Sequence, residues 1–330
     1  MKPRVAVILG PTATGKSHCG IALAKRLNGE IISGDSMLVY QRMDIGTAKP
    51  SAEELAAVPH HLIDILPPDA AFSVVDFKEK AEKIIADINS RGKLPVIVGG
   101  TGLYIKALLE NYEFNTVEEC SELRSELEAF AEEHGNSALY EKLQELDLET
   151  ASRLHINDRR RIIRAIEAAQ SGEKIAHRKS EEWPYETVVF GLRMERESLY
   201  ARINVRVDKM MAEGLVEETK SLLDSGLSLD AQSMRSIGYR QIVWYLQGQM
   251  DKLAAVEKLK QATRNFAKRQ FTWYRQMPYI KWFDLEKEPV YEKIIDEMQQ
   301  TLVEKFKLAS CQYSGGGMTR FIRPVLPCRS

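Results

Sequence analysis

Short apolar runs alternate with amphipathic stretches in the first third of the chain. Four runs have the length and composition of buried strands, and they occupy residues 5–9, 30–33, 62–65 and 95–98. Helical spacing follows the first run at Ile21–Leu27, and a further helix is predicted to begin at the capping box Ser73–Asp76 and to end at Arg91-Gly92. Strands that alternate with helices in this way are typical of a parallel α/β sheet.

The pattern changes twice further along the chain. Residues 116–187 are helical in pattern, with charged surfaces, before Thr187–Arg193 restores a strand-like run. Residues 197–305 are again predicted to be helical. We therefore predict an α/β fold in which a phosphate-loop core with a parallel sheet and a helical C-terminal part is interrupted by a helical insertion. The predicted boundaries are 1–115 and 188–308 for the core and 116–187 for the insertion.

The segment directly after the first run carries the most specific chemical signal. It reads Gly-x-x-x-x-Gly-Lys-Ser between a predicted strand and a predicted helix, which is the context of a phosphate-binding loop. Its glycines let successive backbone N–H groups turn toward one ligand, the helix adds its positive dipole end, Lys16 supplies a cation, and the Ser17 hydroxyl is suited to Mg²⁺. The predicted diphosphate-binding residues are Gly10, Pro11, Thr12, Ala13, Thr14, Gly15, Lys16 and Ser17. Because the loop contacts no base or ribose, a nucleotide and any other diphosphate ester both remain open.

Composition excludes several other classes of protein. The chain is 44% hydrophobic and 28% charged, which is ordinary for a globular protein. Its apolar runs are far shorter than the ~18 residues of a membrane helix, so we expect no membrane association and a cytoplasmic location. The four cysteines are scattered without a C-x-x-C pair, which predicts free thiols and no zinc site. Residues 309–330 lack periodicity, and we expect a disordered tail there.

Two polar residues that follow predicted strands are candidates for chemistry. The Asp35 carboxylate suits a Mg²⁺ ligand or a proton acceptor, although a helix cap uses the same residue type. Thr101 lies within Gly99-Gly-Thr-Gly102, where missing side chains permit close approach by a substrate, although a plain strand-to-helix turn also uses such glycines. Ligands bind at the carboxyl ends of parallel strands. We therefore expect three loops to meet there, namely residues 10–17, 34–36 and 99–102.

Basic residues are segregated locally even though the net charge is only −1. Arg264, Lys268, Phe271 and Arg275 have the spacing of one helix face, and the aromatic residues interleaved with them are Phe266, Trp273, Tyr274, Tyr279 and Trp282. Cations suit phosphates and aromatic rings suit unstacked bases, so the stripe favours single-stranded RNA. An amphipathic helix with core aromatics and solvated cations has the same pattern. A second basic helix is predicted on the insertion, with Arg159, Arg160, Arg161 and Arg164.

Eight motifs in order resemble those of the bacterial tRNA dimethylallyltransferase family. They are Gly10–Ser17, Ser33–Tyr40, Met43–Pro50, His60–Asp64, Gly99–Tyr104, Asn157–Ala165, Ile237–Tyr239 and Ala267–Trp273. The resemblance implies transfer of a dimethylallyl group from dimethylallyl diphosphate to the exocyclic N6 amine of the adenine directly 3′ of the anticodon, in tRNAs that read codons beginning with U. It implies the tRNA anticodon loop and dimethylallyl diphosphate as partners and Mg²⁺ as the cofactor. We expect a monomer.

The resemblance also assigns roles to residues. Lys16, Asp35, Thr101 and Arg206 are implied as catalytic, with Asp35 accepting the amine proton or hydrogen-bonding the amine. Arg206 is implied as a second cation for the diphosphate; a surface ion pair between Arg206 and Asp208 or Asp251 is the alternative. The predicted metal ligand is Ser17. The predicted tRNA contacts are Asp35, Ser36, Met37, Leu38, Thr101, Arg124, Arg159, Arg160, Arg161, Ile162, Ile163, Arg164, Arg264, Lys268 and Arg275.

Two positions depart from the family pattern, because Leu38 stands where the family usually has Gln and Ile156 where it commonly has Pro. Two other functions use the same loop: an ATP-dependent kinase of a small molecule or nucleoside, and a non-catalytic RNA-binding ATPase. Neither accounts for Gly99–Gly102 together with Asp35.

Overall fold

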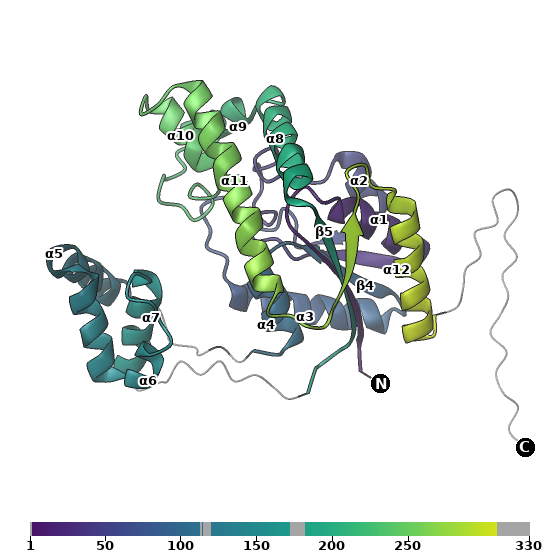
Figure 1. Ribbon diagram of the computed structural model, residues 1–330, viewed down its shortest axis with the longest axis horizontal. Coiled ribbons are helices and arrows are strands. Elements are labelled where there is room, and N and C mark those ends of the chain that lie inside the picture. Colours follow the sequence, from purple (N-terminus) through teal and green to yellow (C-terminus); the bar gives the residue numbers. More distant parts are fainter. Residues whose placement is uncertain (1, 113, 115–119, 172–181, 309–330) are drawn as a thin grey trace, which may run out of the picture.

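A six-stranded, all-parallel sheet forms the centre of the molecule (Figure 1). The computed structural model describes residues 2–112, 114, 120–171 and 182–308. The strands lie in the order β3-β2-β4-β1-β5-β6. Their bounds are β1 Arg4–Leu9, β2 Gly29–Ser33, β3 His60–His61, β4 Leu94–Gly99, β5 Glu186–Met194 and β6 Ile280–Leu285. The α/β fold class predicted from the pattern is confirmed.

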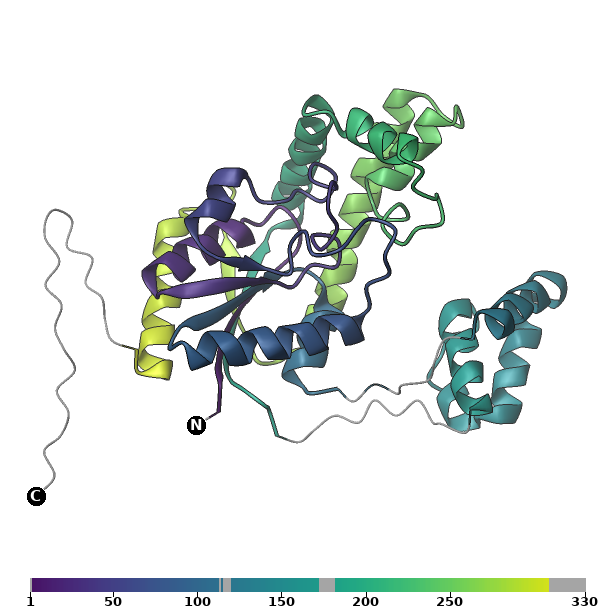
Figure 2. The same cartoon turned by 180° about the vertical axis from the view of Figure 1, so that it is seen from behind.

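Helices cover both faces of the sheet (Figures 1 and 2). Val5, Val7 and Leu9 of β1 belong to one buried cluster, while the alternate residues Ala6 and Ile8 belong to another. Burial on both faces explains why the strands are almost continuously apolar. The helices that accompany the sheet are α1 Lys16–Arg26, α2 Ala52–Ala57, α3 Val74–Ser90, α4 Gly102–Leu109, α8 Arg196–Ala212, α9 Leu215–Asp224, α10 Tyr239–Leu246, α11 Lys252–Tyr274 and α12 Tyr291–Phe306.

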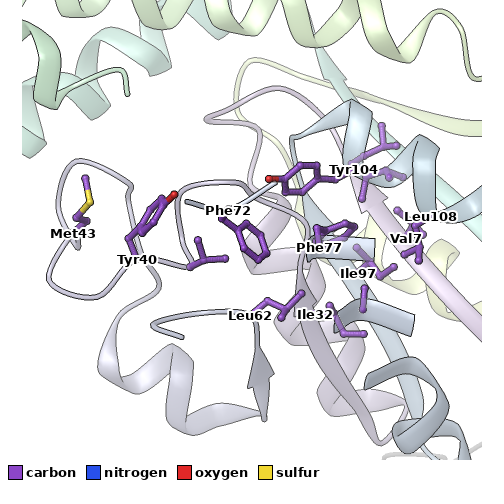
Figure 3. Packing of buried hydrophobic residues seen from close by; sticks show 14 of the residues in the cluster. Val7, Ile32, Tyr40, Met43, Leu62, Phe72, Phe77, Ile97, Tyr104 and Leu108 are labelled. Carbon is purple, nitrogen blue, oxygen red and sulfur yellow. The ribbon is translucent and has the colours of Figure 1, made fainter. Parts of the chain in front are cut away.

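The packing of α3 and α4 fixes the backbone that follows β4. The capping box predicted at Ser73–Asp76 is present at the start of α3. The Phe77 ring of α3 stacks on the Tyr104 ring of α4 with 4.6 Å between centroids, and both lie among buried residues of β1, β2 and β4 (Figure 3). Because such pairs gain about 0.5–1.5 kcal/mol beyond the area that they bury, the first turn of α4 has a defined position.

Two details of the sheet differ from the sequence prediction. The strand expected at 62–65 is instead the two-residue β3, because Leu62 and Asp64 have φ values of 61° and 55°, which a strand cannot contain. The helical prediction for 197–305 is wrong at Ile280–Leu285, which forms β6 and pairs with β5. A short run after a long helix does not reveal its pairing partner, and β5 supplies the backbone hydrogen bonds that make β6 a strand.

Three helices in the middle of the chain pack mainly with one another, and Figures 1 and 2 show them set apart from the sheet. Their bounds are α5 Ser121–Leu146, α6 Leu148–Ala151 and α7 Arg159–Gln170. They enclose a small core of their own that includes Leu127, Leu139, Leu143, Ile162 and Ile166. The strand that follows these helices, β5, begins at Glu186.

The predicted tail, 309–330, and the cysteines Cys311 and Cys328 lie outside the described residues. Cys19 and Cys120 are free thiols, as predicted. Within the ranges that the structure describes, no helix is long and apolar enough to cross a membrane.

Candidate active site

Three loops meet at the carboxyl edge of the sheet, as expected, because β2, β4 and β1 are neighbours. The Thr101 N–H donates to the Gly34 carbonyl at 3.2 Å, and the Ser36 N–H donates to Thr101 Oγ1 at 3.2 Å. These bonds join the loop after β2 to the loop after β4. The Tyr274 hydroxyl, 3.0 Å from the carbonyl oxygens of both Gly10 and Gly100, joins the loop after β4 to the loop after β1.

The loop 10–17 has the backbone of a phosphate-binding loop. Gly15 has φ of 82° and precedes α1, a conformation that favours glycine. A Cβ atom at this position would lie 2.5 Å from the Tyr291 ring, so no other residue fits under that side chain. The Lys16 ammonium donates to the Pro11 carbonyl at 2.7 Å. Burial and the nearby Arg206 lower the pKa of Lys16 to about 7, while Asp35 acts in the opposite direction.

Two arginines of α8 reach the same loop. Arg206 Nη1 donates to Thr12 Oγ1 at 3.0 Å, and Arg202 Nε donates to the Ala13 carbonyl at 2.9 Å. Burial, followed by the charge of Arg202, lowers the pKa of Arg206. The alternative of an ion pair between Arg206 and a neighbouring acid is wrong, because Asp208 pairs with Lys260 and Asp251 caps α11. Cations are thus concentrated on the loop against neutral oxygen acceptors.

Asp35 and Thr101 lie beside this cationic loop. Asp35 does not cap a helix; its Oδ1 accepts the Met37 N–H at 2.8 Å within a turn. The side chain is half-buried, and the Asp35 charge acts on the titration of both Lys16 and Arg206. The Thr101 hydroxyl accepts the Ser36 N–H, so Asp35 and Thr101 are held on adjoining backbone segments. A carboxylate beside a phosphate-binding loop can accept a proton close to a bound phosphate.

The match to a protein-family model decides the relationship of the chain. The model described as IPP transferase matches residues 38–277, which is more than half of the chain. The chain belongs to the IPP transferase family.

Individual members of the family are similar over almost the full length. The chain is 45% identical over 316 residues to the tRNA dimethylallyltransferase of Caldanaerobacter subterraneus, covering 93% of this chain and 100% of that protein. The crystal structure of the tRNA isopentenylpyrophosphate transferase from Bacillus halodurans is 44% identical with a TM-score of 0.71, covering 93% of this chain and 97% of that one. A eukaryotic dimethylallyltransferase acting on tRNA is 26% identical with a TM-score of 0.78, covering 94% and 81%.

Helix α11 lies against two of the glycines that follow β4. The sequence left open whether these glycines admit a substrate or form a plain strand-to-helix turn. A Cβ atom on Gly100 would lie 2.2 Å from Gln270 Nε2, and one on Gly102 would lie 2.6 Å from Trp273 Cβ. At Gly100 and Gly102 the lack of a side chain lets α11 pack directly on the loop, and at Gly99 it lets the loop after β2 approach.

The sequence did not predict four of the side chains that lie at the site. Arg202, Gln270, Tyr274 and Tyr291 all contact the phosphate-binding loop, from α8, α11 and α12. Gln270 lies inside a motif that carries the family resemblance, which was the only signal for it. Tyr291 has none, because its contact with Gly15 joins residues far apart in the chain.

The cations and aromatic residues of the basic stripe on α11 differ in their exposure. Lys268 and Arg275 are exposed, whereas Arg264 donates to Asn204 Oδ1 at 2.7 Å. The aromatic residues do not form an open stacking surface. Tyr274 is buried, and the aromatics packed against the core are Phe271, Trp273, Tyr279 and Trp282.

Most of the predicted cations of the helical insertion are already engaged. Arg124 and Arg164 both pair with the buried Glu167, and Arg159 and Arg161 pair with Glu128 and Asp158. Arg160 is exposed and pairs with no acidic side chain among the described residues. The side chains of Ile162 and Ile163 are buried in the helical core and are not exposed for the tRNA contact that the resemblance implies.

The donor set is consistent with magnesium rather than with a protein-only metal centre. The described residues contain no group of three His, Cys, Asp or Glu side chains able to hold a metal. Ser17 is exposed in the first turn of α1. Mg²⁺ commonly binds through one or two protein oxygens together with substrate phosphates and water, and this site fits that arrangement.

Proposed function

We propose that the protein transfers a dimethylallyl group from dimethylallyl diphosphate to the N6 amine of the adenine directly 3′ of the anticodon, position 37 of tRNA, and releases diphosphate. The tRNAs are those that read codons beginning with U. The observation that carries this proposal is the Asp35–Thr101 pair beside a phosphate-binding loop, in a member of the IPP transferase family. A kinase or an ATPase needs the loop but not this pair.

Departure of diphosphate is the step that the cations assist. When the allylic C–O bond breaks, negative charge develops on the leaving oxygens, and fixed cations nearby stabilise it. Lys16 and Arg206 are the side chains placed for this task. Ser17 would hold Mg²⁺, which adds further positive charge at the leaving group when it is bound.

The acceptor is the amine of an adenine that must leave its stack to reach the site. Asp35 is placed to take the proton that the amine loses as the new C–N bond forms. Thr101 keeps the Asp35 loop against the Gly99–Gly102 loop through the Ser36 N–H bond. Both residues lie at the edge of the sheet where the donor binds, which allows the two substrates to meet.

The remaining tRNA contacts are proposed to come from two basic elements. Arg160 on α7, Lys268 on α11 and Arg275 directly after α11 are exposed, so their charges are available for phosphates. We propose that residues 121–170 act as a clamp on the anticodon stem and loop. The arginines that pair with Glu167 would mainly shape this clamp.

The test supplies either donor to the protein with Mg²⁺ and unmodified tRNA. Mass spectrometry of the digested nucleosides should show the dimethylallyl mass gain on adenosine with dimethylallyl diphosphate and not with ATP. A tRNA with guanine in place of the target adenine is the control and should gain no mass. Turnover of ATP without a mass gain on adenosine would overturn the proposal in favour of a kinase or an ATPase.

A further inference from the structure

Gln270 connects the two loops of the site through both ends of one carboxamide. Its Oε1 accepts the Thr12 N–H of the phosphate-binding loop at 3.1 Å, and its Nε2 donates to the Gly100 carbonyl at 2.9 Å. The side chain is 4% exposed and lies in the interior of α11. It is therefore a rigid spacer between the loop that would hold the donor and the loop that carries Thr101.

Tyr274 repeats the connection one turn further along α11. Its buried hydroxyl lies 3.0 Å from the carbonyl oxygens of Gly10 and of Gly100. A residue and its neighbour four positions later lie on the same face of a helix, so one face of α11 contacts both loops twice. The close fit leaves no room for a side chain at Gly100.

The polar character of Gln270 needs an explanation beyond packing. A buried carboxamide costs free energy unless its hydrogen bonds are made, whereas methionine of similar size would fill the same space without that cost. Here both groups of the carboxamide are used, one on each loop. The reaction itself depends on the distance between these loops, because displacement of about 1 Å between reacting groups lowers rates by as much as roughly 10²-fold.

We propose that Gln270 is a positioning residue for the transfer reaction, setting the distance between donor and acceptor without touching either. This inference rests on the proposed function. It predicts that loss of the carboxamide lowers kcat far more than it weakens binding of either substrate, since each loop keeps its own binding groups.

The main experiment compares Gln270→Met with Gln261→Met. Gln261 is an exposed residue of the same helix, which makes its substitution a matched control. We expect kcat for Gln270→Met to fall roughly 10- to 100-fold, with KM for tRNA and for dimethylallyl diphosphate within about threefold of the unmodified protein. Gln261→Met should leave all three constants unchanged. Equal values for the two variants, or a loss confined to KM, would overturn the proposal.

Gln270→Glu tests the two hydrogen bonds that the carboxamide makes to Thr12 and Gly100. It also replaces the methionine variant if that variant does not fold. As a carboxylate, the new side chain can still accept from the Thr12 N–H but cannot donate to the Gly100 carbonyl. Once protonated, it regains a donor. The ratio of variant kcat to unmodified kcat should therefore rise as pH falls from 8 toward 6, because burial raises the pKa of a carboxyl group. A ratio that does not change with pH would show that the hydrogen bond to the Gly100 carbonyl does not control the rate.

A double-mutant cycle with Thr101→Ala separates positioning from stability. If Gln270 acts by placing the loop of Thr101, its substitution should cost less in kcat once the Thr101 hydroxyl is gone. Additive losses would show that Gln270 only supports the fold. If the unmodified protein gives no mass gain on adenosine, the proposed function itself has failed; if it does and Gln270→Met behaves like Gln261→Met, only the positioning role has failed.

Discussion

The phosphate-binding loop and the helical insertion both concentrate cations, but the two regions use them differently. Around residues 10–17, Lys16, Arg202 and Arg206 donate to backbone carbonyls and hydroxyl groups. In α5–α7, four arginines pair with acids; these are Arg124, Arg159, Arg161 and Arg164. A cation held by neutral acceptors has no carboxylate to offset its charge, so it is available to an incoming anion, whose charge would also raise the lowered pKa of Lys16. A cation paired with a carboxylate mainly stabilises the fold. The sequence shows the same residue types in both places.

The largest effect should come from removing a cation that contacts the phosphate-binding loop. Lys16→Met should lower the rate of dimethylallyl transfer roughly 10²- to 10³-fold, the scale for losing a group that stabilises charge in the transition state. Single-turnover kinetics with saturating tRNA measure it. Lys25→Met, an exposed lysine at the end of the same helix, is the control and should change nothing. A loss below tenfold would mean that the loop N–H groups and Arg206 suffice.

Asp35→Asn tests the anionic partner of these cations. The asparagine oxygen can still accept the Met37 N–H, so the loop should keep its shape while losing charge and basicity. Turnover should fall roughly 10²-fold, the usual scale for a general base, and tRNA binding should persist. Asp69→Asn, at an exposed position, is the control. Near-normal turnover would restrict Asp35 to shaping the turn.

Glu167→Gln tests whether the arginines of the second region are structural. Burial opposes ionisation of Glu167, yet donation from Arg124, the Cys120 N–H and Arg164 holds its pKa below the usual range. The substitution should lower the free energy of unfolding of α5–α7 by about 2 kcal/mol, measured by hydrogen exchange. Glu149→Gln, which removes the exposed pair with Arg153, should cost under about 0.5 kcal/mol.

The contribution of Glu167 to stability has a defined pH dependence. Because the pKa of Glu167 is depressed in the folded state, its contribution is present above the unfolded pKa of about 4.3 and is lost as pH falls through the folded value. The difference between the unmodified protein and Glu167→Gln should therefore shrink below about pH 4. A difference that persists unchanged in acid would rule out the charge as its cause.

Leu38→Gln probes base recognition rather than charge. Leu38 is half-buried in the loop after Asp35, and glutamine there can pair with an adenine edge, a contact worth about 1–3 kcal/mol. KM for tRNA should fall roughly tenfold, with little change in KM for dimethylallyl diphosphate. Unchanged or poorer tRNA kinetics would mean that the pocket has been remodelled around leucine.

The smallest effect sharpens the comparison within the helical insertion. Arg160→Ala should weaken tRNA affinity only a few-fold and reduce the dependence of log affinity on log salt by about one unit, without changing stability. Arg164→Ala should also destabilise α5–α7, because it removes a partner of Glu167. If both variants affect only affinity, pairing with an acid does not mark an arginine as structural.

The sequence predicted the elements that depend on local pattern. The phosphate-binding loop, the capping box at Ser73–Asp76 and the runs of β1, β2 and β4 follow from residue types at short spacing. The prediction failed where distant partners decide. Ile280–Leu285 is a strand only because β5 lies beside it, and Leu62 and Asp64 adopt positive φ although the run looks like a strand.

The phosphate-binding loop was thus predictable from one motif, because such a loop builds its ligand shell from consecutive backbone groups. The side chains that support this loop could not be predicted in the same way. Gln270, Tyr274 and Tyr291 reach the loop across 258 or more residues of chain, and Gly100 and Gly102 pack against α11. The sequence by itself determined which chemical groups are present and predicted the phosphate-binding loop. Only the tertiary structure decided which arginines pair with acids and which side chains set the distance between the phosphate-binding loop and the loop after β4. Pairing and burial depend on contacts between distant segments.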